Sequence, residues 1–193
     1  MDNIIQLKIT LQGTKPPIWR RILVDNRTTF SQLHYIILIT MGWCGGHLYE
    51  FKVYGHRIGE PYRDDDGWGG NLVDASKKSL DSLLSDKKGK FVYTYDFGDC
   101  WKHAVVVEKY LQKEKNVKYP ICIDGKLNCP PEDCGGVWGF YDLLETIKNK
   151  KHPEHKEMLE WLGGDYDPEY FDKNTINKTL ENLAIKSTKK TAR

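Results

Sequence analysis

The sequence of 193 residues is 39% hydrophobic and 12% aromatic, which is enough for the core of one domain built largely from large rings. The formal net charge is +2, but four basic residues lie within the last eight positions. The rest of the chain therefore carries −2 and lacks the basic excess that is typical of a duplex-DNA-binding domain.

The longest apolar run, at 36–39, is far shorter than the roughly 20 residues that a membrane helix needs. No charged and then apolar leader opens the chain, so we expect a cytoplasmic protein without a membrane span. Five cysteines, an odd number without such a leader, favour free thiols or metal ligands over a disulfide framework.

Two strands and a helix are predicted at the start of the chain. Hydrophobic and polar residues alternate over Ile4–Leu11, and a second strand is predicted over Ile18–Val24. Thr29 and Gln32 have the spacing of a capping box, and the apolar residues that follow have helical spacing. Gly42 is a residue type that commonly ends a helix.

A third strand is predicted over His47–Tyr54, where hydrophobic and polar residues alternate again. The stretch 63–71, RDDDGWGGN, is predicted to be an exposed loop. Its acidic residues do not have the spacing of an EF-hand calcium loop, which favours a solvated loop over a calcium site. One short helical turn is predicted near Leu80.

The centre of the prediction is a hairpin of two strands, Phe91–Phe97 and Trp101–Leu111. Every second residue of the first strand is aromatic, so one face of this strand consists of rings. Gly98 and Asp99 break the alternation and form the turn. We expect this hairpin to be a central element of the sheet.

The second half of the chain is predicted to be mainly helical. Residues 119–139 are rich in Pro, Gly and Cys without a period, and are predicted to form a long ordered loop. Helices follow from Phe140, from Pro153, as a short one capped at 167–168, and around Leu180. We expect a single domain over 1–185 and a disordered basic tail over 186–193.

Three cysteines of the long loop are candidate metal ligands. Cys122, Cys129 and Cys134 are spaced more loosely than the paired cysteines of most structural zinc sites, and a fourth ligand such as His103 must come from elsewhere. The cofactor prediction is therefore a possible divalent metal such as zinc. The alternative is a set of small buried thiols.

A second candidate site is a cluster of ionisable residues near the hairpin turn. Its members can serve as general acids and bases or as ligands of a metal ion. They come from the start of the third strand, the hairpin turn and the CPPEDCGG loop: His47, Asp96, Asp99, His103, Glu132 and Asp133. The alternative is structural, with Asp99 capping the turn and His103 lying in the interior.

The aromatic residues allow two interpretations as well. A sheet face covered with rings can stack nucleic-acid bases, or it can form the core beneath helices. No basic residues interleave with the rings of the hairpin, which favours the core. The basic tail can still make weak, non-specific contacts with nucleic acid.

Six stretches together resemble the plasmid pRiA4b ORF-3-like family and cover nearly the whole chain. They are ITLQGTKPPIWRRILV, FSQLHYIILITMGW, HLYEF, YTYDFGDCWKH, CPPEDCGGVWGFYDLLE and EMLEWLGGDYDPEYFD. The resemblance implies a compact prokaryotic α+β domain, often found in plasmid or mobile-element contexts. It assigns no reaction to any residue.

These observations predict an α+β fold, with an antiparallel-dominated sheet, helices packed on one face and a helical C-terminal section. The function that they favour is a non-catalytic module that binds a protein partner or a small ligand. The alternative is a metal-dependent, hydrolase-like enzyme that uses the ionisable cluster or Cys134.

Overall fold

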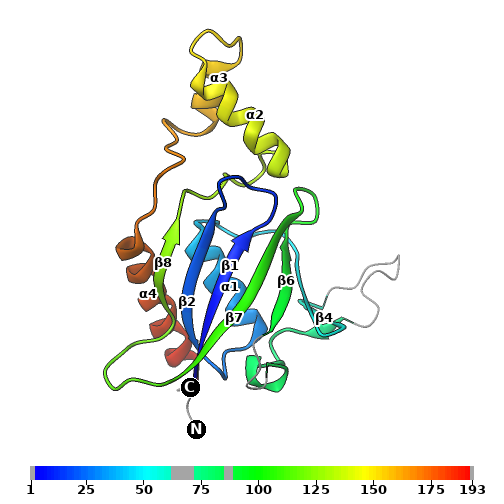
Figure 1. Cartoon of the computed structure of the whole chain (residues 1–193), viewed down its shortest axis with the longest axis vertical. Helices are drawn as coiled ribbons and strands as arrows, with labels where there is room; N and C mark the ends of the chain where they lie inside the picture. The colour runs from blue at the N-terminus through cyan, green and yellow to red at the C-terminus, as the bar shows by residue number, and fades with distance from the viewer. Residues whose placement is uncertain (1–2, 62–71, 85–88, 192–193) are drawn as a thin grey trace.

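One mostly antiparallel sheet forms the body of the protein. The structure is a computed structural model that describes residues 3–61, 72–84 and 89–191 (Figure 1). The strands in these residues are β1 (Asn3–Leu11), β2 (Trp19–Asp25), β3 (Tyr49–Val53), β4 (His56–Gly59), β5 (Val73–Asp74), β6 (Lys90–Tyr95), β7 (Trp101–Gln112) and β8 (Ile121–Lys126). They lie in the order β5-β4-β3-β6-β7-β1-β2-β8, and the pair β4–β5 is parallel. The predicted α+β class is confirmed, and the β6–β7 hairpin lies in the middle of the sheet.

The helix α1 (Phe30–Met41) packs on one face of this sheet and closes the core. Its predicted capping box is present: the Gln32 N–H donates to Thr29 Oγ1 at 3.2 Å, and the Thr29 N–H donates to Gln32 Oε1 at 2.9 Å. The Phe30 ring lies 5.2 Å from the Phe51 ring and 6.3 Å from the Phe91 ring. The inner rings of the strands are therefore core, as the sequence favoured.

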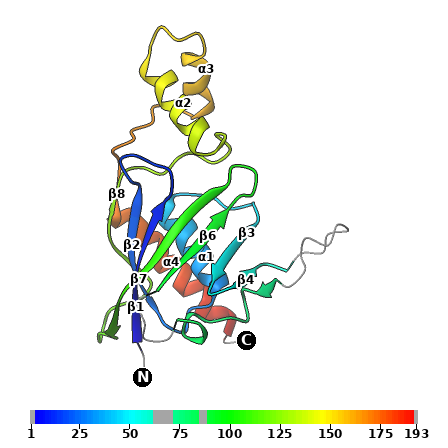
Figure 2. The ribbon, with the colours of Figure 1, turned by 45° about the vertical axis from the view of Figure 1, so that its right-hand side comes forward.

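The C-terminal helices lie in two places (Figures 1 and 2). Helices α2 (Gly136–Lys148) and α3 (His155–Trp161) pack against each other beyond one end of the sheet. Helix α4 (Lys173–Thr191) lies beside β8, where Asn177 acts as a strand partner. The Cys122 N–H donates to Asn177 Oδ1 at 2.7 Å, and Asn177 Nδ2 donates to the Cys122 carbonyl at 2.9 Å. These two bonds satisfy backbone groups at the edge of the sheet.

A buried arginine joins β2 to α1 and β8. Arg20 Nε donates to the Thr40 carbonyl at 2.7 Å, and its Nη1 donates to the Lys126 carbonyl at 3.0 Å. The guanidinium carbon lies 4.8 Å from the centre of the Phe171 ring. Burial lowers the pKa of Arg20, and neighbouring carbonyl groups and an aromatic ring stabilise its charge in place of a carboxylate.

Several predicted boundaries were wrong for local reasons. The stretch 119–139, predicted to be a long loop, contains β8 and the start of α2. Strand β8 was missed because it pairs with β2 over a short, irregular register and its sequence has no clear alternation. Strand β6 ends at Tyr95, two residues before the predicted end, because Asp96 has a left-handed φ of 54°. Strands β4 and β5 were not predicted, and no helix follows Pro168 before α4.

Three expectations concern the loop 63–71, the domain boundary and the basic tail. The loop expected over 63–71 lies outside the described residues. The bounds of α4 continue to Thr191, and both the domain boundary at 185 and the disorder of the basic tail remain predictions. Among the described residues, no helix combines the length and the apolar character that crossing a bilayer requires.

Candidate functional site

The hairpin turn after β6 and the CPPEDCGG loop before α2 lie in direct contact. Asp99 Oδ2 accepts a hydrogen bond from the Gly135 N–H at 3.2 Å. A Cβ atom on Gly136 would lie 2.5 Å from the Asp99 carbonyl oxygen, and Gly136 also has a φ of 70°. Only glycine therefore fits this close approach, and α2 begins where its chain touches the hairpin turn.

Glu132 ties the same loop to the segment between α1 and β3. Its carboxylate accepts hydrogen bonds from the Cys44 N–H at 2.8 Å, from the Gly45 N–H at 3.3 Å and from the Tyr95 hydroxyl. Close by, Trp43 Nε1 donates to the Pro130 carbonyl at 2.9 Å. The carboxylate of Glu132 therefore joins its own loop to the segment after α1 and to the end of β6. Its role in the site is to position these three segments.

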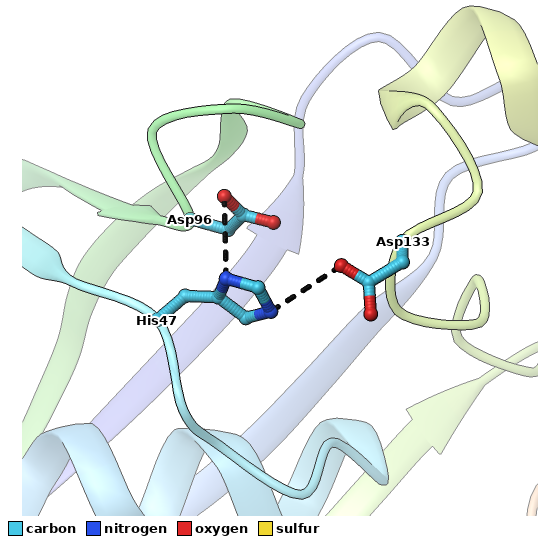
Figure 3. A group of neighbouring side chains, drawn as sticks. All are labelled: His47, Asp96 and Asp133. Atoms are coloured by element: carbon cyan, nitrogen blue, oxygen red, sulfur yellow. Dashed lines mark ion pairs between the residues drawn. The ribbon is translucent and has the colours of Figure 1, made fainter.

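His47 lies between two carboxylates at the surface formed by these segments (Figure 3). Its Nδ1 is 3.7 Å from Asp96 Oδ1, and its Nε2 is 3.4 Å from Asp133 Oδ1. The side chains of Asp96, His47 and Asp133 are 10%, 36% and 70% exposed, so exposure to solvent increases across the group from Asp96 to Asp133. Asp96 Oδ1 is held in place because it also accepts the Gly98 N–H at 2.9 Å.

This arrangement supports two kinds of chemistry. When the imidazole is protonated, both of its N–H groups can donate, one toward each carboxylate. Alternatively, one ring nitrogen and one oxygen from each carboxylate can bind a divalent cation, since these three atoms lie within 4.8 Å of one another. In the part of the chain that the structure describes, these three residues are the group with that geometry.

The candidate His103 does not join this group. It is completely buried under Trp43, whose ring centre lies 5.4 Å away, and beside Tyr93 at 5.3 Å. Burial lowers the pKa of His103 to about 4, and both ring nitrogens are without a hydrogen-bond partner among the described residues. The backbone carbonyls of Tyr93 and Trp101 favour its charged form, but they lie outside hydrogen-bond geometry. The residue is an interior histidine, in agreement with the structural alternative.

The cysteine candidates are also not gathered into a cluster of metal ligands among the described residues. Cys122 and Cys129 are buried, and burial raises the pKa of both thiols. Burial and then the nearby Asp99 raise the pKa of Cys134 to about 12. This geometry supports neutral, packed thiols, with Cys122 in strand β8 and the other two in the loop before α2.

These differences predict two classes of thiol. Cys44 and Cys100 are exposed, whereas the other three are shielded or disfavoured as thiolates. The measurement uses a disulfide reagent that releases a chromophore when it reacts with a thiol. At pH 8 we expect it to react quickly with two thiols, and with the other three only after denaturation. The double variant Cys44→Ser/Cys100→Ser should lose the fast phase, and a third fast thiol would contradict the burial of Cys134.

Three exposed apolar side chains, which were not among the predicted site residues, lie in the segments that form the site. Leu48 is next to His47, Phe97 is next to Asp96, and Trp138 lies in the first turn of α2. Trp138 is 85% exposed. Phe97 is 47% exposed, so the prediction that the rings of the hairpin belong to the core was wrong for this one. The turn that gives Asp96 its positive φ also ends the alternation before Phe97.

Comparisons with known proteins point to one family. The family model described as plasmid pRiA4b ORF-3-like protein matches residues 3–175, a range that includes every candidate site residue. The uncharacterized protein y4hQ of Sinorhizobium fredii is 36% identical over 193 residues, covering 99% of this chain and 97% of the relative. A crystal structure of a protein of unknown function from Methanosarcina mazei Go1 is similar with a TM-score of 0.82 and 40% identity. That similarity covers 91% of this chain and 97% of the other.

Proposed function

The chain belongs to the family of plasmid pRiA4b ORF-3-like proteins, and from that premise we propose that it is a non-catalytic binding module. The module takes a cationic group of a protein or small-molecule partner at the loops around His47. It works in the cytoplasm, which the five free thiols support, since disulfides are rare in that compartment. An association with plasmids or other mobile elements is part of the proposal and rests on the family alone.

The observation that carries this proposal is the charge of the loop cluster, defined here as residues 43–48, 96–100 and 129–136. It contains four carboxylates and one imidazole, and no lysine or arginine. Asp99 and Glu132 hold the loops together, whereas Asp133 is mostly exposed and Asp96 is fixed at the rim. A fixed acidic site of this kind favours a positively charged group.

The exposed apolar side chains support the same ligand class. Trp138 and Phe97 belong to segments that are joined through Gly135 and Asp99. An exposed aromatic ring favours the head group of lysine or arginine through its electron-rich face. Tryptophan is also enriched among the residues that carry most of the energy at protein interfaces.

A labelled hexa-arginine peptide provides the probe, with binding measured by fluorescence anisotropy. We expect Asp133→Asn to weaken binding about fivefold or more, because one charge-assisted contact is lost. The matched control is Asp142→Asn, which removes the same charge from an exposed position on α2. Equal losses in the two variants, or no loss in either, would contradict a specific site at the loop cluster.

A second candidate function is a metal-dependent, hydrolase-like enzyme, which the spacing of His47, Asp96 and Asp133 favours. Titration with Mn²⁺, followed by the loss of the free-ion paramagnetic resonance signal, tests this candidate. One ion per chain, abolished by His47→Ala and competing with hexa-arginine, would favour the enzyme. Peptide binding that is unchanged in the presence of Mn²⁺ would favour the module.

A further inference from the structure

The face of the sheet opposite α1 has no helix on it among the described residues. In Figure 1 the strands β2, β1 and β7 lie in front of α1, and the side toward the viewer is open; Figure 2 agrees. Paired residues in neighbouring antiparallel strands share a face. The pairs Lys8–Arg21, Lys8–Val106 and Lys90–Val106 therefore place outward side chains from β6, β7, β1 and β2 in one layer.

This basic sheet face carries a charge that the sum along the chain conceals. Over β6, β7, β1, β2 and β8 its basic side chains are Lys8, Arg21, Lys90, Lys102, Lys109 and Lys126. Its acidic side chains are Glu108, Asp124 and, at the end of β2, Asp25. Six positive and three negative charges give +3, against +2 for the whole chain, so all other residues together carry −1.

Each acid of the face is already paired. Asp25 Oδ2 lies 3.1 Å from Lys113 Nζ, just beyond the end of β7, and the other two acids pair with the same arginine. Arg21 Nε lies 2.7 Å from Glu108 Oε2, and Arg21 Nη1 lies 3.1 Å from Asp124 Oδ2. The five lysines of the face have no carboxylate within ion-pair distance in the described part of the chain. Lys8 also lies directly opposite Arg21, a like-charge pair that disfavours the sheet by itself. An external polyanion would relieve this repulsion.

An aromatic ring lies among these charges. Lys8 Nζ is 4.8 Å from the centre of the Trp19 ring, and the Arg21 guanidinium carbon is 4.9 Å from it. Trp19 is half-buried on the open side of β2, paired with Lys126 on β8. Next to this group is a shallow hollow of about 810 Å³, lined by Gln6, Arg21, Lys90, Val106, Glu108 and Lys109.

We propose that the basic sheet face binds single-stranded nucleic acid, with lysines on phosphates and a base stacked on Trp19. Charge complementarity selects a polyanion, and the ring among cations selects one that carries bases. The five strands span about 19 Å, which is wider than the roughly 12 Å major groove of a duplex, so the face cannot enter that groove. An open sheet of this width accommodates two or three unstacked bases of a single strand.

The test is fluorescence anisotropy of the full chain with a labelled twelve-residue oligothymidylate and with a duplex of the same length. We expect Lys8→Gln/Lys102→Gln to weaken binding about tenfold or more and to reduce the slope of log K against log salt by about 1.4. Trp19→Leu should also weaken binding about tenfold, with the salt slope unchanged, because stacking carries no counterion. The matched control Lys150→Gln/Lys151→Gln removes two exposed charges beyond the end of the sheet and should change neither quantity.

Four results would overturn the proposal. The first is unchanged affinity in Lys8→Gln/Lys102→Gln, provided that its circular dichroism and melting temperature match the wild type. The second is duplex binding as tight as single-strand binding. The third is equal competition by polyglutamate, which would point to an acidic protein. The fourth is loss of binding confined to Lys189→Gln/Lys190→Gln, which would place the contact in the C-terminal tail. Asp133→Asn should not affect this binding, so the face and the loop cluster are tested independently.

Discussion

Replacing Tyr95 with alanine is expected to lower the free energy of unfolding by about 3–5 kcal/mol, as for other large buried rings. Tyr95 is fully buried, and its ring centre lies 5.2 Å from that of Trp43 and 5.8 Å from that of His47. The substitution creates a cavity at the end of β6, and it also removes one of the three donors to Glu132. The measurement is urea unfolding followed by circular dichroism.

The variant Tyr95→Phe separates these two effects. It keeps the ring and removes only the hydroxyl, so we expect a loss of about 1 kcal/mol together with faster amide exchange at Cys44 and Gly45. The control is Tyr170→Ala, because the Tyr170 side chain is half exposed and is not part of the core cluster. A Tyr95→Ala protein as stable as Tyr170→Ala would contradict the central position of the hairpin.

Mild acid is expected to destabilise the protein through two buried histidines. Burial lowers the pKa of both His34 and His103 to about 4, from an ordinary value of 6.5. Below pH 6.5 the unfolded chain binds protons that the folded protein does not, so stability falls as the pH falls from 6.5 toward 4. The expected loss between pH 7 and pH 5 is about 2 kcal/mol for each histidine.

Urea unfolding at a series of pH values measures this effect. His103→Phe should remove about half of the loss between pH 7 and pH 5, since a ring of similar size remains in the same contacts. His56→Gln is the matched control, because it replaces an imidazole that is exposed on β4 and lies outside the core. A pH dependence that is identical in His103→Phe and the wild type would mean that His103 is accessible to protons in the folded state.

The effect has a structural reason in the core. His34 stacks on Tyr49 with ring centres 3.7 Å apart, and its Nδ1 lies 2.7 Å from the Tyr93 hydroxyl. The charged form of either imidazole would have to give up water without gaining a carboxylate. Both histidines therefore act as part of the aromatic core. His103 and the surface residue His47 were predicted as candidates of one site, because their sequence positions do not show which of them is buried.

The sequence predicted those features that local chemistry decides. The capping box of Thr29 and Gln32 depends on two residues three positions apart, and the α1 helix begins where they predict. Alternation predicted β1, β2, β6 and β7, because each of these strands has one face in the core and one outside. Strands β4, β5 and β8 were missed because they are short or irregular, so pairing with a neighbour is what makes them strands.

The grouping of the candidate residues was decided by the tertiary structure. His47, Asp96 and Asp133 come from three segments, and they meet because Glu132 and Asp99 join the loops and because Gly136 permits the close approach. His103 lies only seven residues from Asp96, yet its strand turns it into the core. Alternation in the sequence predicts on which face of its strand a side chain lies. It does not predict which residues of other segments lie next to that side chain.

Charge shows the same division most clearly. The sequence by itself determined the composition, the α+β class, the main strands and the family to which the chain belongs. The net charge of the whole chain is only +2, because a sum over the sequence does not record on which face of the fold each charged side chain lies. Folding sends alternate residues of β6, β7, β1, β2 and β8 to one open face with +3, and it leaves the carboxylates of the loop cluster at the end of the sheet. The separation into a basic face and an acidic end exists only in the tertiary structure, because strand pairing alone brings residues far apart in sequence into one layer.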